Sequence, residues 1–227
     1  TLRENMLTSL KPLALDQVLH LKSDGAQIVD VRTPKEFAMG HLCGSVNISL
    51  DGPFETWSAI ILNREHTIVL IAEPEQEREA IIRLARVGHD HVTGYLHRGI
   101  HALASTPELT LATNRISATH LNELIMTVNH PHILDLRSQH EWEQRRIDDS
   151  RNIPLQNLEQ HLQEIPKDHP VVVHCTSGYR SSIAVSLLEH HGFTNIQDLV
   201  GGFEAWEAHV VNLSLQSSDS LQQAGGR

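Results

Sequence analysis

The chain carries one pattern of residues twice, and this duplication constrains its fold more than any other feature. Residues 28–37 (IVDVRTPKEF) match residues 133–142 (ILDLRSQHEW), which lie 105 positions later. Residues 46–50 match residues 151–155 at the same offset. Solenoid repeats are shorter, about 20–50 residues, so this period indicates two copies of one domain. A chain of 227 residues is long enough for two domains with hydrophobic cores.

Short runs of Val, Ile and Leu alternate with helix-like segments in each copy. The second copy predicts strands at residues 133–136, 171–173 and 196–199, and helices at residues 121–129, 158–164, 183–191 and 203–208. Such alternation is typical of a mostly parallel sheet with helices on both faces. We therefore predict an α/β fold with domains at residues 1–110 and 111–213. A flexible tail, rich in Ser, Gln and Gly, is expected at residues 214–227.

Cys175 stands where the strand at residues 171–173 gives way to a tight loop and then a helix. Ligands of parallel sheets sit at the carboxyl ends of strands. Loop N–H groups and the positive end of the helix dipole favour the reactive thiolate. Arg180 adds a forked cation that can hold an anionic sulfur or phosphorus group. Gly178 permits the tight turn, and Ser181 or Ser182 is expected to cap the helix.

The order Cys-x-x-Gly-x-Arg after a Val-rich strand resembles the active-site loop of rhodanese-type sulfurtransferases. The repeated Asp-x-Arg elements and the motif GGFEAW at residues 201–206 resemble further signatures of that family. The resemblance covers residues 13–103 and 116–211 and implies two rhodanese-like domains. It implies catalytic roles for Cys175 and Arg180 and structural support from Asp135 and Arg137. The substrate-binding residues implied are Thr176, Ser177, Gly178, Tyr179 and Ser181.

The first copy lacks the features that would make the loop reactive. Ala72 stands where the second copy has Cys175, so the nucleophile is missing. Pro74 removes one backbone donor, and acidic side chains would repel an anionic sulfur donor. We therefore predict that the first domain is catalytically inactive. The acidic residues of this segment are Glu73, Glu75, Glu77 and Glu79.

Residues 50–57, 83–88 and 94–96 of the first copy support a narrower comparison. With the second copy's loop, they resemble the tandem rhodanese region of bacterial fusion proteins that begin with a metallo-β-lactamase-fold persulfide dioxygenase. This resemblance implies such a dioxygenase domain upstream in a longer protein. The chain itself has no His-x-His-x-Asp-His metal motif. Sulfur transfer through a cysteine needs neither a metal nor an organic cofactor, so we expect none. We interpret residues 89–91 (HDH) as a solvated turn.

Composition limits the partners of the chain. The net charge of −10, from 18 basic and 28 acidic residues, argues against nucleic acids and anionic membranes. No apolar run is long enough to cross a bilayer. The cysteines Cys43 and Cys175 lie far apart and do not suggest a disulfide framework. A nucleophilic thiol must stay reduced, so a cytoplasmic location is expected.

The leading interpretation is sulfur transfer in two steps through a Cys175 persulfide. The donor would be thiosulfate or a low-molecular-weight persulfide, and the acceptor a thiol such as glutathione, or cyanide. A phosphatase or arsenate reductase remains an alternative. Tyrosine phosphatases place five residues between Cys and Arg where this chain has four, and Asp148 and Asp149 stay open as general acids. A non-catalytic scaffold or persulfide sensor is the third interpretation.

Overall fold

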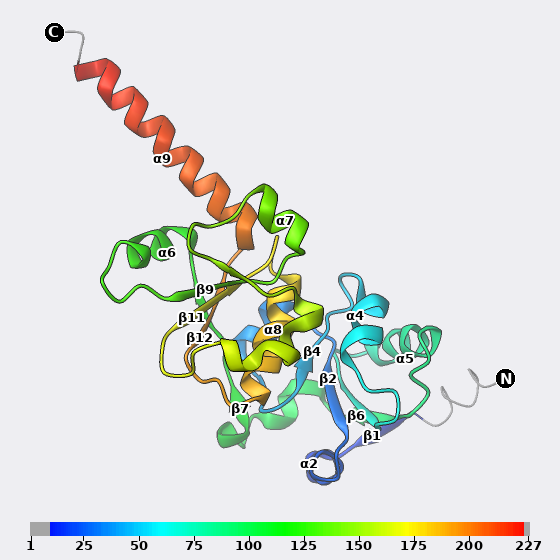
Figure 1. Cartoon of the computed structure of the whole chain (residues 1–227). Coiled ribbons are helices and arrows are strands. Elements are labelled where there is room, and N and C mark those ends of the chain that lie inside the picture. Colours follow the sequence, from blue (N-terminus) through cyan, green and yellow to red (C-terminus); the bar gives the residue numbers. More distant parts are fainter. Residues whose placement is uncertain (1–9, 225–227) are drawn as a thin grey trace. The chain divides into compact units, whose positions relative to one another are not determined.

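A computed structural model describes residues 10–224 of the chain (Figure 1). The chain forms two compact units. One comprises the residues up to Thr113 together with Val185–Phe193, and the other comprises Asn114–Ala184 and the residues from Thr194 onward. Each unit contains a five-stranded parallel sheet, and corresponding strands occupy the same positions in the two sheets. The two domains predicted from the repeat are therefore both α/β units with a parallel sheet.

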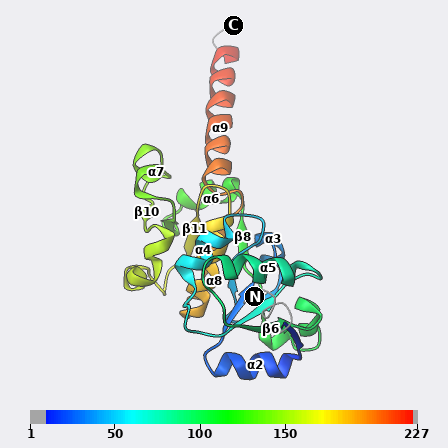
Figure 2. The same ribbon diagram turned by 90° about the vertical axis from the view of Figure 1, so that its right-hand side faces the viewer.

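The sheet of the first unit has the order β1-β6-β5-β2-β4. Its strands are β1 (Lys11–Leu13), β2 (Gln27–Asp30), β4 (Val46–Asn47), β5 (Ile68–Ile71) and β6 (Val92–Leu96). Its helices are α2 (Leu15–Ser23), α3 (Pro34–Met39), α4 (Phe54–Ile61) and α5 (Gln76–Arg86), with 3₁₀ turns η1 (Gly99–Leu103) and η2 (Pro107–Leu109). A short antiparallel pair joins β3 (His41–Leu42) to β7 (Thr110–Leu111). Figure 2 shows α2 and α5 from the side.

The sheet of the second unit has the order β10-β9-β11-β12-β8. Its strands are β8 (Asn114–Ile116), β9 (His132–Asp135), β10 (Arg151–Asn152), β11 (Val171–His174) and β12 (Ile196–Leu199). Its helical elements are α6 (Ala118–Ile125), α7 (Gln139–Gln144), the 3₁₀ helix η3 (Leu155–Glu164) and α9 (Gly202–Ala224). The helix α8 (Tyr179–His190) belongs to the second unit up to Ala184 and to the first from Val185 on.

The central strand of each sheet is buried along its whole length. β5 consists of four apolar residues, and β11 consists of three valines followed by His174. All side chains of both strands are buried. A strand covered on both faces needs such a run rather than an alternation of polar and apolar residues. In the second unit, Val172 lies in one core with Leu121, Leu199 and other apolar residues. This burial fixes the carboxyl end of β11, where Cys175 begins the loop.

Two helix starts differ from the expectations. The side chain of Ser117 accepts a hydrogen bond from the His120 amide, so α6 begins earlier than predicted. α8 begins at Tyr179, which places Ser181 and Ser182 inside its first turn. The expectation that one of these serines caps the helix from outside is therefore wrong.

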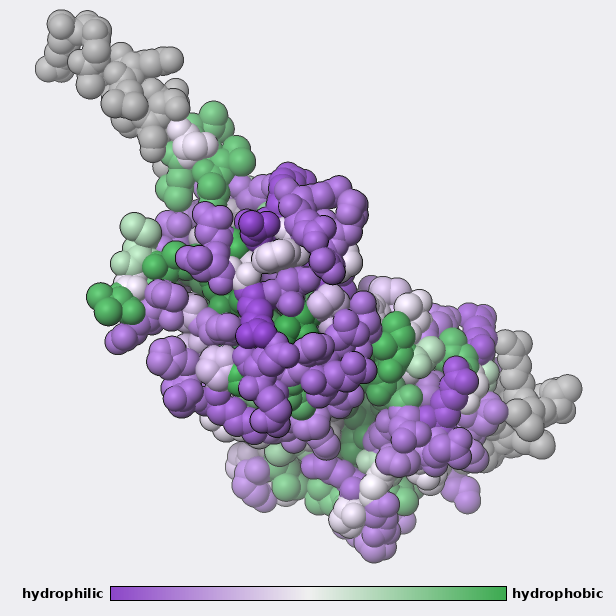
Figure 3. Space-filling model, in the orientation of Figure 1, coloured by the Kyte–Doolittle hydropathy of each residue, from purple (hydrophilic) through white to green (hydrophobic). Residues whose placement is uncertain are grey.

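The last helix is longer than the sequence pattern indicated. α9 runs through Gly202–Ala224, so the backbone is helical across residue 213, where the predicted tail begins. Figures 1 and 2 show this helix extending away from the sheet of its unit. It carries exposed apolar side chains at Val211 and Leu215, and Figure 3 shows hydrophobic surface along this helix. Residues 225–227 of the predicted tail lie outside the described residues. No helix within residues 10–224 combines the length and the apolar character needed to span a bilayer.

Candidate active site

Cys175 directly follows the buried strand β11, at the carboxyl end of the parallel sheet. Its residue surface is only 1% exposed. The amide of Gly178 donates a hydrogen bond to Cys175 Sγ over 3.2 Å. Gly178 has φ +116°, a conformation that side-chain-bearing residues rarely adopt. The loop therefore turns back over the sulfur and points a backbone donor at it.

The beginning of α9 holds the loop from the other side. The amides of Phe203 and Glu204 donate hydrogen bonds to the carbonyl oxygens of Cys175 and Thr176, over 2.8 and 3.1 Å. A β-carbon at position 202 would lie 2.5 Å from the Cys175 carbonyl oxygen. Gly202 is therefore required for this close approach, which explains one glycine of the predicted GGFEAW motif.

Arg180 is paired with Glu141 of α7. Its two terminal nitrogens donate to the two carboxylate oxygens over 3.0 and 2.8 Å. Thr176 Oγ1 donates to the same carboxylate over 3.1 Å and lies 2.5 Å from Arg180 Nη2. The Arg180 guanidinium, with help from Ser138, holds the pKa of Glu141 well below its ordinary value. Sequence reasoning placed Arg180 in the loop but did not identify Glu141 as its partner.

A buried acid, Asp198, also lies close to the loop. Ser181 Oγ is 3.9 Å from Cys175 Sγ and donates to Asp198 Oδ1 over 2.7 Å. Asp198 also accepts a hydrogen bond from Arg115 Nε over 3.0 Å. Burial raises the pKa of Asp198, and the hydrogen bond from Ser181 opposes that shift. Ser181 therefore lies near the sulfur, and its expected role in substrate binding stays a prediction, whereas Asp198 and Arg115 were not anticipated.

Asp135 and Arg137 form a buried pair under the neighbouring strand end. Arg137 Nη2 donates to Asp135 Oδ2 over 2.6 Å and to the carbonyl oxygen of Arg145 over 2.7 Å. The Arg137 guanidinium also lies over the Phe203 ring, 3.9 Å from its centroid. Asp30 and Arg32 make the matching pair in the first unit. The supporting role that the resemblance implies for Asp135 and Arg137 stays a prediction.

His174 is fully buried beside the nucleophile. Its Nδ1 lies 3.3 Å from the Cys175 carbonyl oxygen. Its Nε2 is 3.5 Å from Asp135 Oδ2 and has no hydrogen-bond partner, so this contact is too long to count as a bond. Burial lowers the pKa of His174, which keeps the imidazole neutral near neutral pH.

In the first unit, the loop after β5 is placed like the Cys175 loop but lacks its cysteine and its arginine. Ala72 follows β5 and is buried, and a β-carbon at Gly99 would lie 2.6 Å from its carbonyl oxygen. The amide of Glu73 donates to Gln76 Oε1 over 3.1 Å. The matching position to Arg180 is Glu77. The expectation of a missing thiol therefore applies to a loop that is otherwise similarly placed, and Glu77 shows that this loop also lacks the arginine.

The remaining candidates do not join this site. Ser177 is exposed, and Tyr179 opens α8 with a partly buried side chain. Asp148 and Asp149 are exposed and line a cavity with Trp206, and no residue of the Cys175 loop lines that cavity. His89 is buried, and its Nε2 lies 3.0 Å from the Ser58 carbonyl oxygen, so the solvated-turn interpretation is wrong for this residue. Within residues 10–224, no group of three or more His, Cys, Asp or Glu side chains is arranged to hold a metal.

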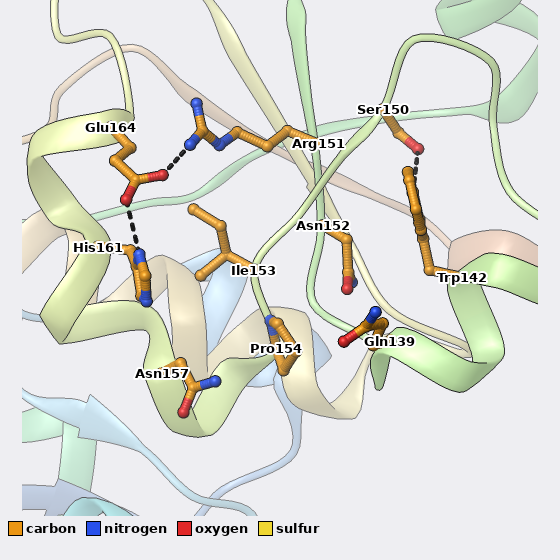
Figure 4. A pocket seen from close by; sticks show the side chains of 10 residues that line it. All are labelled: Gln139, Trp142, Ser150, Arg151, Asn152, Ile153, Pro154, Asn157, His161 and Glu164. Atoms are coloured by element: carbon orange, nitrogen blue, oxygen red, sulfur yellow. Dashed lines mark hydrogen bonds and ion pairs between the residues drawn. The ribbon is translucent and has the colours of Figure 1, made fainter.

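A cavity of about 550 Å³ lies beside α7 and β10 (Figure 4). Trp142 Nε1 donates to Ser150 Oγ over 3.0 Å on one wall. Glu164 pairs with Arg151 and with His161 on the opposite wall. The cavity is lined by no residue of the Cys175 loop.

Comparisons with known proteins agree with this geometry. Residues 14–106 and 117–209 each match the rhodanese-like domain family. The chain is 33% identical over 115 residues to "Adenylyltransferase and sulfurtransferase MOCS3" of Arabidopsis thaliana, covering 44% of this chain and 25% of that protein. It is 32% identical over 77 residues to "Thiosulfate sulfurtransferase GlpE" of Coxiella burnetii, covering 34% of this chain and 72% of that protein.

Two further matches have a similar sequence identity and cover a similar share of this chain. A "Sulfurtransferase" of Allochromatium vinosum is 32% identical over 96 residues, which is 42% of this chain and 90% of that protein. The crystal structure of a rhodanese-related protein from Thermoplasma volcanium has 32% sequence identity and a TM-score of 0.39, and it covers 42% of this chain and 92% of that chain. Together the two family matches cover most of the sequence, so the chain belongs to the rhodanese-like domain family and contains two domains of it.

Proposed function

We propose that the second domain is a sulfurtransferase that carries sulfane sulfur on Cys175. The observation that carries this proposal is the Gly178 amide, which donates to Cys175 Sγ at the start of α8. A backbone donor at a helix start stabilises negative charge on a sulfur both before and after sulfur is received. The loop amides of residues 176–181 and the Arg180 guanidinium are assigned to this role.

The transfer has two steps. The Cys175 thiolate attacks the outer sulfur of a donor R–S–SH, the donor's S–S bond breaks, and R–S⁻ leaves with the electron pair. The enzyme is then a Cys175 persulfide. An acceptor thiolate attacks the outer sulfur of that persulfide and regenerates the Cys175 thiolate. Thiosulfate reacts in the same way and releases sulfite, and cyanide accepts the sulfur as thiocyanate.

The proposal includes a cellular setting. A thiol that must remain reduced is suited to the cytoplasm. Glutathione is the proposed acceptor or, as its persulfide, the proposed donor. A metallo-β-lactamase-fold persulfide dioxygenase, joined upstream in a longer protein, is the proposed partner because it would use the same class of persulfide. The resemblance of the first copy to such fusion proteins supports this part.

Steady-state kinetics test the reaction type. With thiosulfate or glutathione persulfide as donor and cyanide as acceptor, double-reciprocal plots at several acceptor concentrations should give parallel lines, the pattern of a covalent two-step route. Cys175→Ser should abolish thiocyanate formation. Cys43→Ser is the matched control, because Cys43 is exposed and lies in the inactive domain. Activity that survives in Cys175→Ser would contradict the proposal.

A further inference from the structure

The cation of the Cys175 loop is neutralised by a fixed carboxylate. Both terminal nitrogens of Arg180 are engaged by Glu141, whose side chain is 36% exposed, while that of Arg180 is 22% exposed. A bidentate pair of this kind is the strongest form of an Arg–carboxylate contact. The guanidinium fork that would otherwise be directed at a doubly charged donor is therefore already occupied.

Glu141 is held in this position by its own helix. It completes a capping box at the start of α7, where its Oε2 accepts from the Ser138 amide and hydroxyl over 2.8 and 2.7 Å. The same carboxylate thus serves the helix start and the Arg180 fork. A side chain fixed twice keeps its charge close to the loop.

In the first unit, the corresponding glutamate has only the helix-capping role. Glu36, at the position matching Glu141, makes the same capping box with Thr33 at the start of α3. The first-unit residue matching Arg180 is Glu77, so the capping glutamate has no loop arginine to bind. Helix capping therefore accounts for a glutamate at this position, and the pairing with Arg180 is an additional property of the second unit.

The other charges near the loop also occur in pairs. Asp198 accepts from Arg115, and Asp135 is paired with Arg137. The buried imidazole of His174 is neutral near neutral pH. With Glu141 and Arg180 cancelling each other, no unpaired cation among these groups is left to offset the charge of an incoming donor.

We infer that Glu141 is a positioning residue that makes the loop select hydropersulfides over the thiosulfate dianion. The inference rests on the proposed sulfurtransferase function and names its donor class. When thiosulfate meets the Cys175 thiolate, three negative charges share the site, whereas a hydropersulfide that reacts in its protonated –S–SH form adds no charge at the reacting sulfur. Like charges at short range in a partly screened site repel strongly. A neutralised Arg180 offsets this repulsion less than a free one.

The reactions differ in the group that leaves. From a hydropersulfide, Cys175–S⁻ and R–S–SH give Cys175–S–SH and R–S⁻. From thiosulfate, Cys175–S⁻ and S–SO₃²⁻ give Cys175–S–S⁻ and SO₃²⁻. In the second case the leaving dianion needs a cation, and Glu141 offsets the positive charge that Arg180 supplies.

The test compares Glu141→Gln with Glu36→Gln. Glutamine supports a capping box without a charge, so both variants keep their helix starts and only the first one frees Arg180. The quantity measured is kcat/KM for thiosulfate divided by kcat/KM for glutathione persulfide. In Glu141→Gln this ratio should rise about tenfold, mainly through a lower KM for thiosulfate, because one nearby negative charge is removed. In Glu36→Gln it should equal that of the wild type.

A second measurement does not depend on turnover. Cys175 is alkylated with the anion iodoacetate and with neutral iodoacetamide in the Cys43→Ser background. The alkylation rate with iodoacetate divided by the rate with iodoacetamide should rise in Glu141→Gln, because a freed Arg180 attracts the carboxylate of iodoacetate. A mere loss of folding would change both rates together and leave the ratio alone.

The outcomes separate the inference from the function on which it rests. If wild-type protein forms thiocyanate through Cys175 but neither ratio changes in Glu141→Gln, Glu141 does not set donor charge selectivity. A ratio that also rises in Glu36→Gln would assign the effect to helix capping and overturn the inference as well. If Cys175→Ser and wild type are equally inactive with both donors, the proposed sulfurtransferase function itself is contradicted.

Discussion

Gly202 approaches Cys175 so closely that a β-carbon at residue 202 would lie 2.5 Å from the Cys175 carbonyl oxygen. Gly202 also has φ +58°. The start of α9 and the nucleophile loop are therefore packed backbone to backbone. Gly99 and Ala72 repeat this relationship in the first unit, with a distance of 2.6 Å and φ +54° at Gly99.

Substituting this glycine should damage both stability and loop geometry. Gly202→Ala should destabilise the protein by about 1–3 kcal/mol, because the added methyl group strains the backbone and pushes the loop away. Gly99→Ala should have a similar cost by the same mechanism. Urea denaturation measures the loss of stability, and cyanide-dependent turnover measures the loop. Only Gly202→Ala should slow turnover, and a variant with wild-type kinetics would contradict the importance of this packing.

Removing the hydroxyl of Ser181 should leave the buried carboxylate of Asp198 without one of its hydrogen bonds. Ser181→Ala leaves Asp198 Oδ1 without its 2.7 Å hydrogen bond, which should cost about 1–3 kcal/mol. Asp198→Asn, which keeps an acceptor for Ser181 but removes the charge facing Arg115, tests the other half of this contact. Denaturation of the two single variants and the double variant gives the coupling between the sites. Fully additive costs would show that Ser181 and Asp198 do not act together.

Restoring a thiol in the first unit should not restore reactivity. In an Ala72→Cys/Cys175→Ser double variant, the new thiol follows β5 as Cys175 follows β11. It would lack a loop arginine, since residue 77 is glutamate, and Pro74 lacks an amide donor. We expect no sulfur on residue 72 after exposure to donor, as measured by peptide mass spectrometry. Sulfuration as fast as that of Cys175 in the wild type would show that these loop features are dispensable.

Buried histidines should make the protein less stable in mild acid. Burial lowers the pKa of His174, so the unfolded chain binds a proton there at a pH where the native protein does not. The stability from His174 is therefore complete above pH 6.5 and declines as the pH falls from that value towards the native pKa. One such group changes the unfolding free energy by at most about 1.4 kcal/mol per pH unit.

The variant His174→Ile tests this dependence. Isoleucine is the residue that β5 carries at the matching position, Ile71, which is fully buried. Urea denaturation between pH 7 and 5 should give a flatter profile for the variant than for the wild type. An identical slope would show that His174 is protonated equally in the native and unfolded states.

Much of the fold could be predicted because the repeat appears in the sequence itself. The matched motifs gave two α/β domains, and the Val-rich run before Cys175 predicted a buried central strand, which β11 confirms. The alignment of Ala72 with Cys175 needed only the order of residues in each copy. These features depend on local pattern, which is readable from one chain.

The parts that could not be predicted depend on contacts between distant segments. Glu141 belongs to a motif that was recognised, but its pairing with Arg180 joins residues 39 positions apart. Asp198 meets Ser181 only because β12 lies next to β11 in the sheet. The early start of α8 was missed because the polar residues that begin this helix carry no apolar periodicity. Sheet order, rather than residue type, brings these groups together.

The most direct test of the account is the intact mass of the protein after a short exposure to glutathione persulfide, for wild type, Cys43→Ser and Cys175→Ser. The account predicts that wild type and Cys43→Ser each gain one sulfur atom and that cyanide removes it. Over the same exposure time, Cys175→Ser should gain no sulfur. Absence of the adduct from folded, reduced wild-type protein, or its equal formation in Cys175→Ser, would contradict a persulfide carried on Cys175.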